Sequence, residues 1–300
     1  MNTAIKNSMI SFYQKIKNTL MRKYVSAAFT ALIVLMGSVV LTACGGSSEF
    51  PPVITAVKVQ SASYGRTATL YLGGKDLRSS LVVESGGGCI NPSFASSSTT
   101  DVLVLNCVVK TVGDISLTIR AATGEVVYNT TMTVPKPQVT LVTSKGAIIL
   151  ELDPAKAPIS TNNFLSYVAS GFYKDTLFHR VISGFVVQGG GYVSGMLKRT
   201  SSSSPIELES NKGLSNLRGT LAMARTNVPN SATSEFFVNL VDNLSLDYKN
   251  AVNPGYAVFG TVVQGMDVVD AIAAETTGVV KGFADVPLSD ITITLAVQTQ

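Results

Sequence analysis

The stretch of sequence that decides the fold is FHRVISGFVVQGGG, residues 178–191. Strand-like alternation puts Arg180 on the same face as Phe178 and Ile182. A charge against such an apolar face is costly unless it has a partner or a task, so we expect either a structural ion pair or a binding role. His179 lies on the opposite face, where we expect a structural core histidine. The glycines do not form a phosphate loop, because the G-K-[ST] ending is missing and no helix pattern follows.

The composition of the chain excludes several classes of protein. With 46% hydrophobic and 14% charged residues among 300, it is not a disordered polar chain and can fill two modest cores. His179 is the only histidine, and three cysteines leave too few ligands for a closed zinc site. No G-x-S-x-G motif presents a serine nucleophile. We therefore expect no metal site, no cofactor and no Ser-His-Asp hydrolysis.

The positive charge is confined to the beginning of the chain. The formal net charge is +4, but five of the 23 basic residues precede residue 44, where no acidic residue lies. The remainder therefore lacks the basic excess that draws proteins to phosphate backbones, and we expect no nucleic-acid partner.

The first 43 residues have the pattern of an export signal. Residues 24–43 carry no charge, follow a basic pair at 22–23 and run into the tetrad LTAC at 41–44. The tetrad resembles the lipobox of bacterial lipoproteins, which implies cleavage before Cys44 and lipidation of that cysteine. Two alternatives stay open: the uncharged run is long enough for a transmembrane anchor, and Met21 is a second candidate start.

Glycine rather than aspartate follows Cys44, which implies, by analogy with lipoprotein sorting, passage to the outer membrane. We therefore expect residues 1–43 to be a signal peptide and residues 44–52 a lipidated linker. The predicted protein is an exported bacterial lipoprotein of the outer membrane, facing the periplasm or the cell surface. The membrane is then a partner through the lipid on Cys44.

Residues 53–134 have the pattern of a small β-sandwich. Five β-rich runs separated by glycine turns have the spacing of sandwich strands, at 53–60, 67–72, 102–109, 115–120 and 126–134. The stretch weakly resembles the immunoglobulin-like modules of bacterial surface proteins. Cys89 and Cys107 fall inside it, and an oxidising compartment after export favours a disulfide between them, with a redox pair as the alternative.

A second domain begins at about residue 138, after a stiff Pro-Lys-Pro linker at 135–137. Its opening, residues 138–152, has the pattern of a β-hairpin. One helix is expected after Pro158, capped by Ser160 and stopped by Gly171, and another over 266–275. Most of the remainder is strand and loop, so the domain is β-dominated with two helices.

Four separated blocks in this domain carry a specific resemblance. The first is FHRVISGFVVQGGG, and the others are RGTLAMAR at 218–225, SEFFVNL at 234–240 and GYAVFGTVVQGMDVVD at 255–270. In this order they resemble the signature of cyclophilins, the cyclosporin-binding family of peptidyl-prolyl cis-trans isomerases. The resemblance covers residues 138–300 and implies an eight-stranded antiparallel barrel capped by two helices. The predicted fold class is therefore mainly β, with this barrel preceded by an immunoglobulin-like sandwich.

The resemblance also implies which residues form the site. Arg180 is the catalytic arginine, and Gln188 holds the substrate backbone. The other implied residues line a proline pocket or the rim that faces it: Phe185, Val186, Phe237 and Leu246 in the pocket, with Ala224, Arg225 and Tyr256 around it. The implied partners are proline-containing polypeptides, and the implied reaction is isomerisation of X-Pro bonds in exported proteins.

Two positions depart from the family pattern. Glu235 stands in the binding site where glutamine is usual, and we expect its carboxylate to pair with Arg180 and weaken catalysis. On that reasoning, Glu235→Gln raises turnover. Ser245 replaces a bulky aromatic residue at the rim, which predicts weak cyclosporin binding.

Two other functions stay open. A catalytically weakened proline-peptide binding module or chaperone is the main alternative, and a surface adhesin that acts through residues 53–134 is another. Glu207 and Glu209 can share a strand face, where we expect a solvated edge.

Overall fold

The computed structural model describes residues 51–200 and 203–300. All the described residues belong to one compact unit of the chain. The predicted signal peptide and Cys44 lie outside the described residues. Within the described ranges, no helix combines the length and the apolar character needed to cross a membrane.

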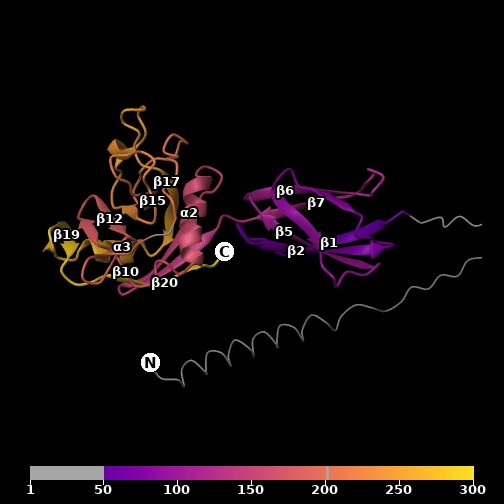
Figure 1. The fold of residues 1–300 in the computed structure, drawn as a ribbon, viewed down its shortest axis with the longest axis horizontal. Coiled ribbons are helices and arrows are strands. Elements are labelled where there is room, and N and C mark those ends of the chain that lie inside the picture. The colour runs from indigo at the N-terminus through magenta and orange to yellow at the C-terminus, as the bar shows by residue number, and fades with distance from the viewer. Residues whose placement is uncertain (1–50, 201–202) are drawn as a thin grey trace, which may run out of the picture. The chain divides into compact units, whose positions relative to one another are not determined.

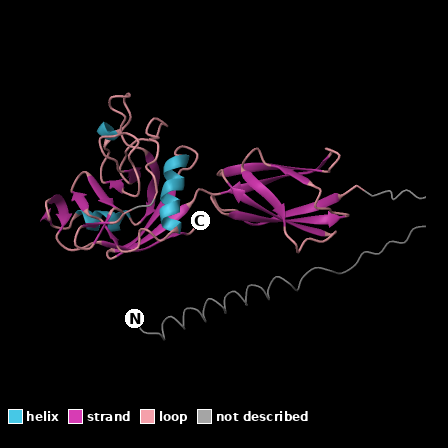
Figure 2. Cartoon of the chain, in the orientation of Figure 1, coloured by secondary structure: helices cyan, strands magenta, loops and turns pink. Residues whose placement is uncertain are grey.

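Two antiparallel sheets form the first part of the described chain (Figures 1 and 2). One has the strand order β1-β2-β5-β4 and the other the order β3-β6-β7. The strands are β1 (Val53–Ser61), β2 (Thr67–Lys75), β3 (Val82–Glu84), β4 (Cys89–Phe94), β5 (Val102–Val109), β6 (Gly113–Arg120) and β7 (Val126–Val134). All five predicted strands are present. Sequence patterning misses β3, which is short, and β4, whose pairing is interrupted beside Asn91, a residue with a φ of +53°.

Both sheets bury side chains. In β5, buried residues such as Leu105 and Cys107 alternate with less buried ones, and Leu117 of β6 is equally buried. The predicted disulfide is present, because Cys89 of β4 is bonded to Cys107 of β5, with their Cα atoms 5.5 Å apart. Since β4 and β5 are neighbours, the disulfide links adjacent strands of one sheet and does not join the two sheets.

The second part of the chain is built on one large curved antiparallel sheet (Figure 2). Its order is β11-β12-β16-β15-β17-β9-β8-β20-β10-β13-β14. The first eight strands in this order have three or more residues each: β11 (Arg180–Ile182), β12 (Val186–Gly189), β16 (Phe236–Asn239), β15 (Thr220–Met223), β17 (Val258–Gln264), β9 (Gly146–Leu152), β8 (Gln138–Thr143) and β20 (Thr292–Gln298). The last three have two residues each: β10 (Thr176–Leu177), β13 (Tyr192–Val193) and β14 (Leu197–Lys198). A separate hairpin joins β18 (Thr277–Val280) to β19 (Phe283–Pro287).

Two α-helices occur in the described residues, as predicted. They are α2 (Pro158–Ala169) and α3 (Met266–Ala273), and a short 3-10 helix, η1, spans Leu244–Leu246. Helix α2 starts with proline, whose fixed φ and missing N–H suit the first turn of a helix. Its buried face includes Phe164, which meets Phe236 of β16 edge to face at 5.4 Å and so packs the helix on the sheet.

The predicted cap of α2 is wrong. Ser160 lies inside the first turn, and the residue at the cap position, Ala157, has no side chain that can bond the helix. Glu209 satisfies the free donors instead: its buried carboxylate accepts bonds from the backbone N–H of Ile159 at 3.0 Å and of Ser160 at 2.7 Å. The Ser160 hydroxyl donates a third bond at 2.8 Å. The solvated edge expected for Glu207 and Glu209 is therefore wrong for Glu209, because a helix N-terminus attracts its charge.

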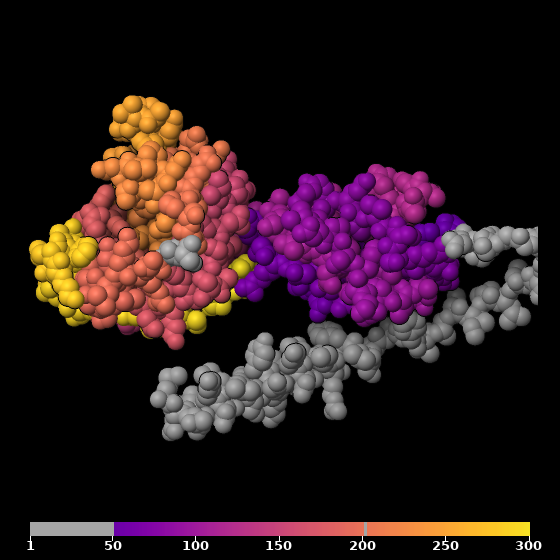
Figure 3. All heavy atoms as spheres, in the orientation of Figure 1, coloured from indigo at the N-terminus to yellow at the C-terminus, as the bar shows by residue number. Residues whose placement is uncertain are grey.

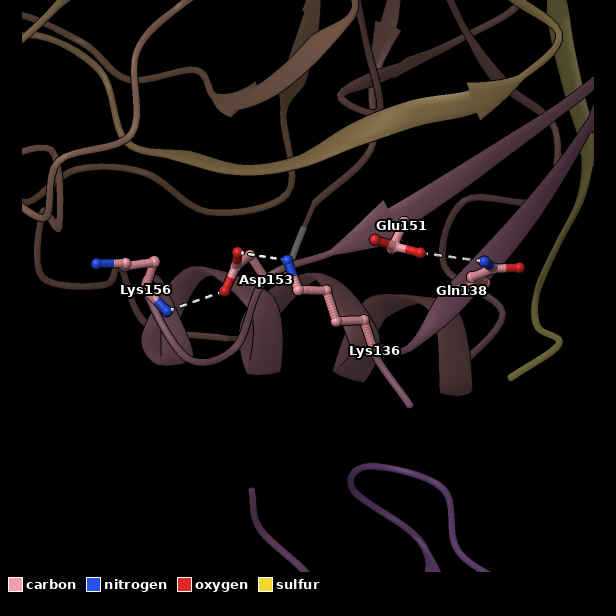
Figure 4. Close-up of polar contacts among 5 residues, drawn as sticks. All are labelled: Lys136, Gln138, Glu151, Asp153 and Lys156. Carbon is pink, nitrogen blue, oxygen red and sulfur yellow. Dashed lines mark hydrogen bonds and ion pairs between the residues drawn. The ribbon is translucent and has the colours of Figure 1, made fainter. Parts of the chain in front are cut away.

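Polar contacts hold the beginning of the curved sheet (Figure 4). Lys136 of the proline-rich linker donates from Nζ to Asp153 at 2.8 Å, and Asp153 also accepts from the backbone N–H of Lys156 at 3.1 Å. Gln138 donates from Nε2 to Glu151, its partner in the β8-β9 pairing, at 3.3 Å. These contacts fix where β8 begins and where β9 ends.

Candidate active site

The predicted site residues lie along one row that crosses neighbouring strands. Strand pairing sets Arg180 of β11 opposite Gln188 of β12. Gln188 is in turn opposite Phe237 of β16, and Phe237 is opposite Ala222 of β15. Because directly opposite residues share a face of a sheet, a cation, an amide and an aromatic ring lie side by side on one face.

The two faces of these strands serve different clusters. Val181, Val187 and Val238 belong to the main core. Their alternate neighbours point the other way and form a second cluster: Val186, Ala222, Phe237 and Val258. The period-two alternation of strands therefore separates the main core from a smaller buried apolar cluster on the other face.

Val186 and Phe237 of this second cluster form the floor of a pocket of about 130 Å³, which we call the central pocket. Nine of the predicted residues line it: Arg180, Phe185, Val186, Gln188, Ala224, Arg225, Phe237, Leu246 and Tyr256. Phe237 is 4% exposed and meets the Tyr256 ring edge to face at 5.6 Å. The Arg180 side chain is 41% exposed, so a charged group borders an apolar floor at the solvent boundary. The tenth predicted residue, Glu235, does not line this pocket.

Glu235 belongs to a separate polar cluster beside the central pocket. Its Oε2 atom accepts a hydrogen bond from Gln188 Nε2 at 2.9 Å and lies 3.2 Å from His179 Nε2. Burial raises the pKa of Glu235, but the hydrogen bonds from His179 and Gln188 and the charges of His179 and Lys198 outweigh it. The pKa of Glu235 therefore lies below its ordinary value of 4.5, and the side chain is ionised at neutral pH.

His179 is a buried structural residue, as predicted. It is 5% exposed, and its ring packs on Tyr192 with the centroids 4.6 Å apart. Its Nδ1 atom is buried without a hydrogen-bond partner among the described residues, so the contact with Glu235 is the polar anchor of the ring. Burial, and then the charge of Glu235, raise the pKa of Tyr192 above its ordinary value.

The carboxylate beside Arg180 is not the predicted one. Asp285 Oδ2 lies 3.8 Å from Arg180 Nε, which is within ion-pair range and too long for a hydrogen bond. Among the described residues, no ion pair joins Arg180 to Glu235, so that prediction is wrong. The physical reason is that His179 and Gln188 hold the Glu235 carboxylate at a different place.

Comparison with known proteins identifies the family of this domain. Residues 138–297 match the family described as cyclophilin type peptidyl-prolyl cis-trans isomerase/CLD. The chain belongs to this family. It is 52% identical over 155 residues to "Peptidyl-prolyl cis-trans isomerase A" of Dickeya dadantii (strain 3937), a match that covers 52% of this chain and 80% of that relative. It is 49% identical over 157 residues to "Peptidyl-prolyl cis-trans isomerase B" of Escherichia coli (strain K12), which covers 52% of this chain and 95% of that relative.

Among solved structures, a crystal structure of a Cryptosporidium parvum cyclophilin type peptidyl-prolyl cis-trans isomerase has 27% sequence identity and a TM-score of 0.47. The match covers 55% of this chain and 98% of that one. On the strength of the family match and the bacterial relatives, the chain is a peptidyl-prolyl cis-trans isomerase.

In this cyclophilin the rim of the central pocket is open at Ser245. A second hollow of about 320 Å³, the rim hollow, is lined by Ser245 and shares Arg225, Leu246 and Tyr256 with the central pocket. Arg225 is fixed there, because its guanidinium lies over the Tyr256 ring at 4.6 Å and its Nε donates to Gly255 O at 2.9 Å. The segment that follows η1 stands out from the rest of the isomerase domain (Figures 1 and 3).

Sequence reasoning misses three charged or aromatic neighbours of the site. Asp285 contacts Arg180, while Lys198 and Tyr192 surround the Glu235 cluster. These residues lie outside the four sequence blocks of the family. No local pattern marks them, because Tyr192 and Lys198 are brought together by the pairing of β13 with β14, and Asp285 reaches Arg180 from the separate β18-β19 hairpin.

Proposed function

We propose that this cyclophilin is an exported, lipid-anchored isomerase that assists the folding of exported proteins by stabilising twisted X-Pro bonds. The proposal rests on the LTAC tetrad at 41–44 and the uncharged run before it. Residues 1–43 then form the signal peptide, residues 44–52 the lipidated linker, and residues 138–300 the isomerase domain. The lipid on Cys44 would hold the protein at the outer membrane, facing the periplasm or the cell surface.

One observation carries the assignment of the site: the nine residues around the central pocket combine an apolar floor with a guanidinium at its edge. A floor that contains Phe237 suits the apolar ring of proline. Gln188, opposite Phe237 in the pairing of β12 with β16, suits the peptide backbone on either side of that ring. We assign Arg180 as the catalytic residue.

The mechanism follows from the chemistry of the X-Pro amide. Rotation is slow because resonance gives the C–N bond double-bond character, with a barrier of ~18–20 kcal/mol. No bond has to be made or broken, so the enzyme needs only to bind the twisted amide more tightly than the planar one. Each ~1.4 kcal/mol of that difference accelerates the reaction tenfold.

Arg180 is suited to make that difference. When the amide twists, the proline nitrogen becomes pyramidal and regains its lone pair. A guanidinium can donate a hydrogen bond to this nitrogen, or to the neighbouring carbonyl, without losing its own charge. Phe237 holds the ring while the amide turns.

For residues 53–134 we propose an immunoglobulin-like module that acts as a stalk between the lipid and the isomerase domain. Two sheets with the orders β1-β2-β5-β4 and β3-β6-β7 correspond to the ABED and CFG sheets of constant-type immunoglobulin domains. The Cys89–Cys107 disulfide differs from the antibody pattern, since it lies within one sheet.

The test is isomerisation of a short X-Pro peptide by the purified full-length chain, beside its Arg180→Ala variant. We expect the variant to lose at least about 100-fold in kcat/KM, a loss of about 2.7 kcal/mol of transition-state stabilisation. Unchanged activity in the variant would remove Arg180 from the mechanism. Peptide binding without activity in either protein would instead favour the weakened binding module.

A further inference from the structure

The β18-β19 hairpin contains an irregularity next to the site. Gly278 pairs with Val286 and Val280 pairs with Phe283, so two residues of β19, Ala284 and Asp285, face a single residue of β18. Two residues of one strand opposite one residue of its partner define a β-bulge. Bulges occur beside active sites, where the extra residue turns a side chain away from its regular direction.

Asp285, the second of these two residues, has an unusual backbone conformation. Its φ is +61°, in the left-handed region that side chains other than those of asparagine and aspartate adopt with difficulty. In this conformation its carboxylate reaches across to β11, where Oδ2 lies 3.8 Å from Arg180 Nε. Within the part of the chain that the structure describes, this is the only ion pair of Arg180.

The hairpin is anchored on both sides of Asp285. Val286, the next residue, is 4% exposed. Before Asp285, the ring of Phe283 meets the Tyr192 ring at 5.3 Å, and Lys281 donates from Nζ to Gly195 O at 2.7 Å. The carboxylate is therefore carried by a segment that is fixed to the sheet.

We propose that Asp285 is a positioning residue that orients the guanidinium of Arg180 toward the bound X-Pro amide. The inference rests on the catalytic role proposed for Arg180. A long arginine side chain that is 41% exposed has many rotamers, and a fixed carboxylate beside Nε reduces their number. Because Asp285 faces Nε, both terminal NH2 groups remain free to donate to the substrate.

The first test compares Asp285→Asn with Asp290→Asn in the full-length chain. Asparagine also adopts positive φ, so the first change removes the charge and keeps the backbone conformation. Asp290 is exposed in the same C-terminal segment, so Asp290→Asn is the matched control that also removes one negative charge. We expect Asp285→Asn to lower kcat/KM by about two- to fivefold, the range of a solvent-exposed ion pair, with peptide affinity unchanged because the pocket floor is intact. Asp290→Asn is expected to have no effect, and equal effects of the two would overturn the proposal.

Two further measurements separate positioning from a general loss of structure. In an Arg180→Ala background, Asp285→Asn is expected to have no additional effect, since the residue through which it acts is absent. A loss of the same factor in that background would overturn the proposal. The ¹⁵N order parameter of Arg180 Nε is expected to fall in Asp285→Asn and to stay unchanged in Asp290→Asn. This readout does not depend on activity, so an unchanged order parameter overturns the positioning role even if Arg180 proves not to be catalytic.

Discussion

Removal of the buried carboxylate of Glu209 should destabilise the isomerase domain far more than removal of its exposed neighbour. Glu209 is 4% exposed and accepts three hydrogen bonds at the first turn of α2. Glu209→Ala leaves two backbone N–H groups and the Ser160 hydroxyl without their acceptor. The hydroxyl belongs to a residue that is fully buried, so water cannot easily replace the lost partner.

The expected magnitude follows from these contacts. A hydrogen bond to a charged group contributes about 1.5–3 kcal/mol, and a negative charge at a helix N-terminus about 0.3–2 kcal/mol. The bonds share one acceptor group and are not additive, so we expect Glu209→Ala to lower the free energy of unfolding by about 3–4 kcal/mol. Glu209→Gln keeps an acceptor oxygen but loses the charge, and about half of that loss is expected.

Chemical unfolding followed by circular dichroism at 222 nm measures this effect. The chain has no tryptophan, and both described α-helices belong to the isomerase domain, so loss of the signal from these two helices reports on that domain. With an m-value of ~2 kcal/mol/M, the urea midpoint should fall by about 1.5–2 M. Glu207→Ala is the control and should change the free energy of unfolding by less than about 0.5 kcal/mol. If the two alanine variants lose the same stability, the capping role of Glu209 is refuted.

Three other changes test separate parts of the structure. Since the folded state lowers the pKa of Glu235, its ionisation stabilises the fold above the ordinary pKa of 4.5, and this contribution is lost as pH falls through the lower folded value. Glu235→Gln should therefore reduce the loss of stability below about pH 4.5 in acid titrations, and a steeper loss would contradict this. The same change breaks no ion pair with Arg180, so we no longer expect it to raise turnover. Ser245→Trp would add about 60 Å² of apolar contact at the rim, which at ~25 cal/mol/Å² tightens cyclosporin binding about tenfold in a titration. Already tight binding by the unchanged chain would refute the argument from Ser245. Replacing Cys89 and Cys107 by serine should lower the free energy of unfolding of residues 53–134 by about 3 kcal/mol, as measured by calorimetry. Isomerase activity should stay unchanged.

Local patterns were sufficient for five strands of the first part, for the β8-β9 hairpin and for both described α-helices. Burial alternates along β5, and the β8-β9 hairpin follows the same period-two rule, so the sequence predicts both elements. Each pattern lies within one short segment and depends on which face of that segment is buried. The nine residues around the central pocket could be predicted for a related reason, since they lie in or beside the sequence blocks that resemble the family.

The sequence by itself therefore determined these elements, the family and the residues around the pocket, while the tertiary structure alone decided the partners of the charged residues. Glu209 caps a helix about 50 residues before it, Glu235 binds His179 and Gln188 rather than Arg180, and Asp285 reaches Arg180 from a different hairpin. Burial periodicity is a property of neighbouring residues and is visible in the sequence. The distance between two charges depends on the register of strands far apart in the chain and on backbone irregularities such as the bulge at Asp285, and no local pattern records either of them.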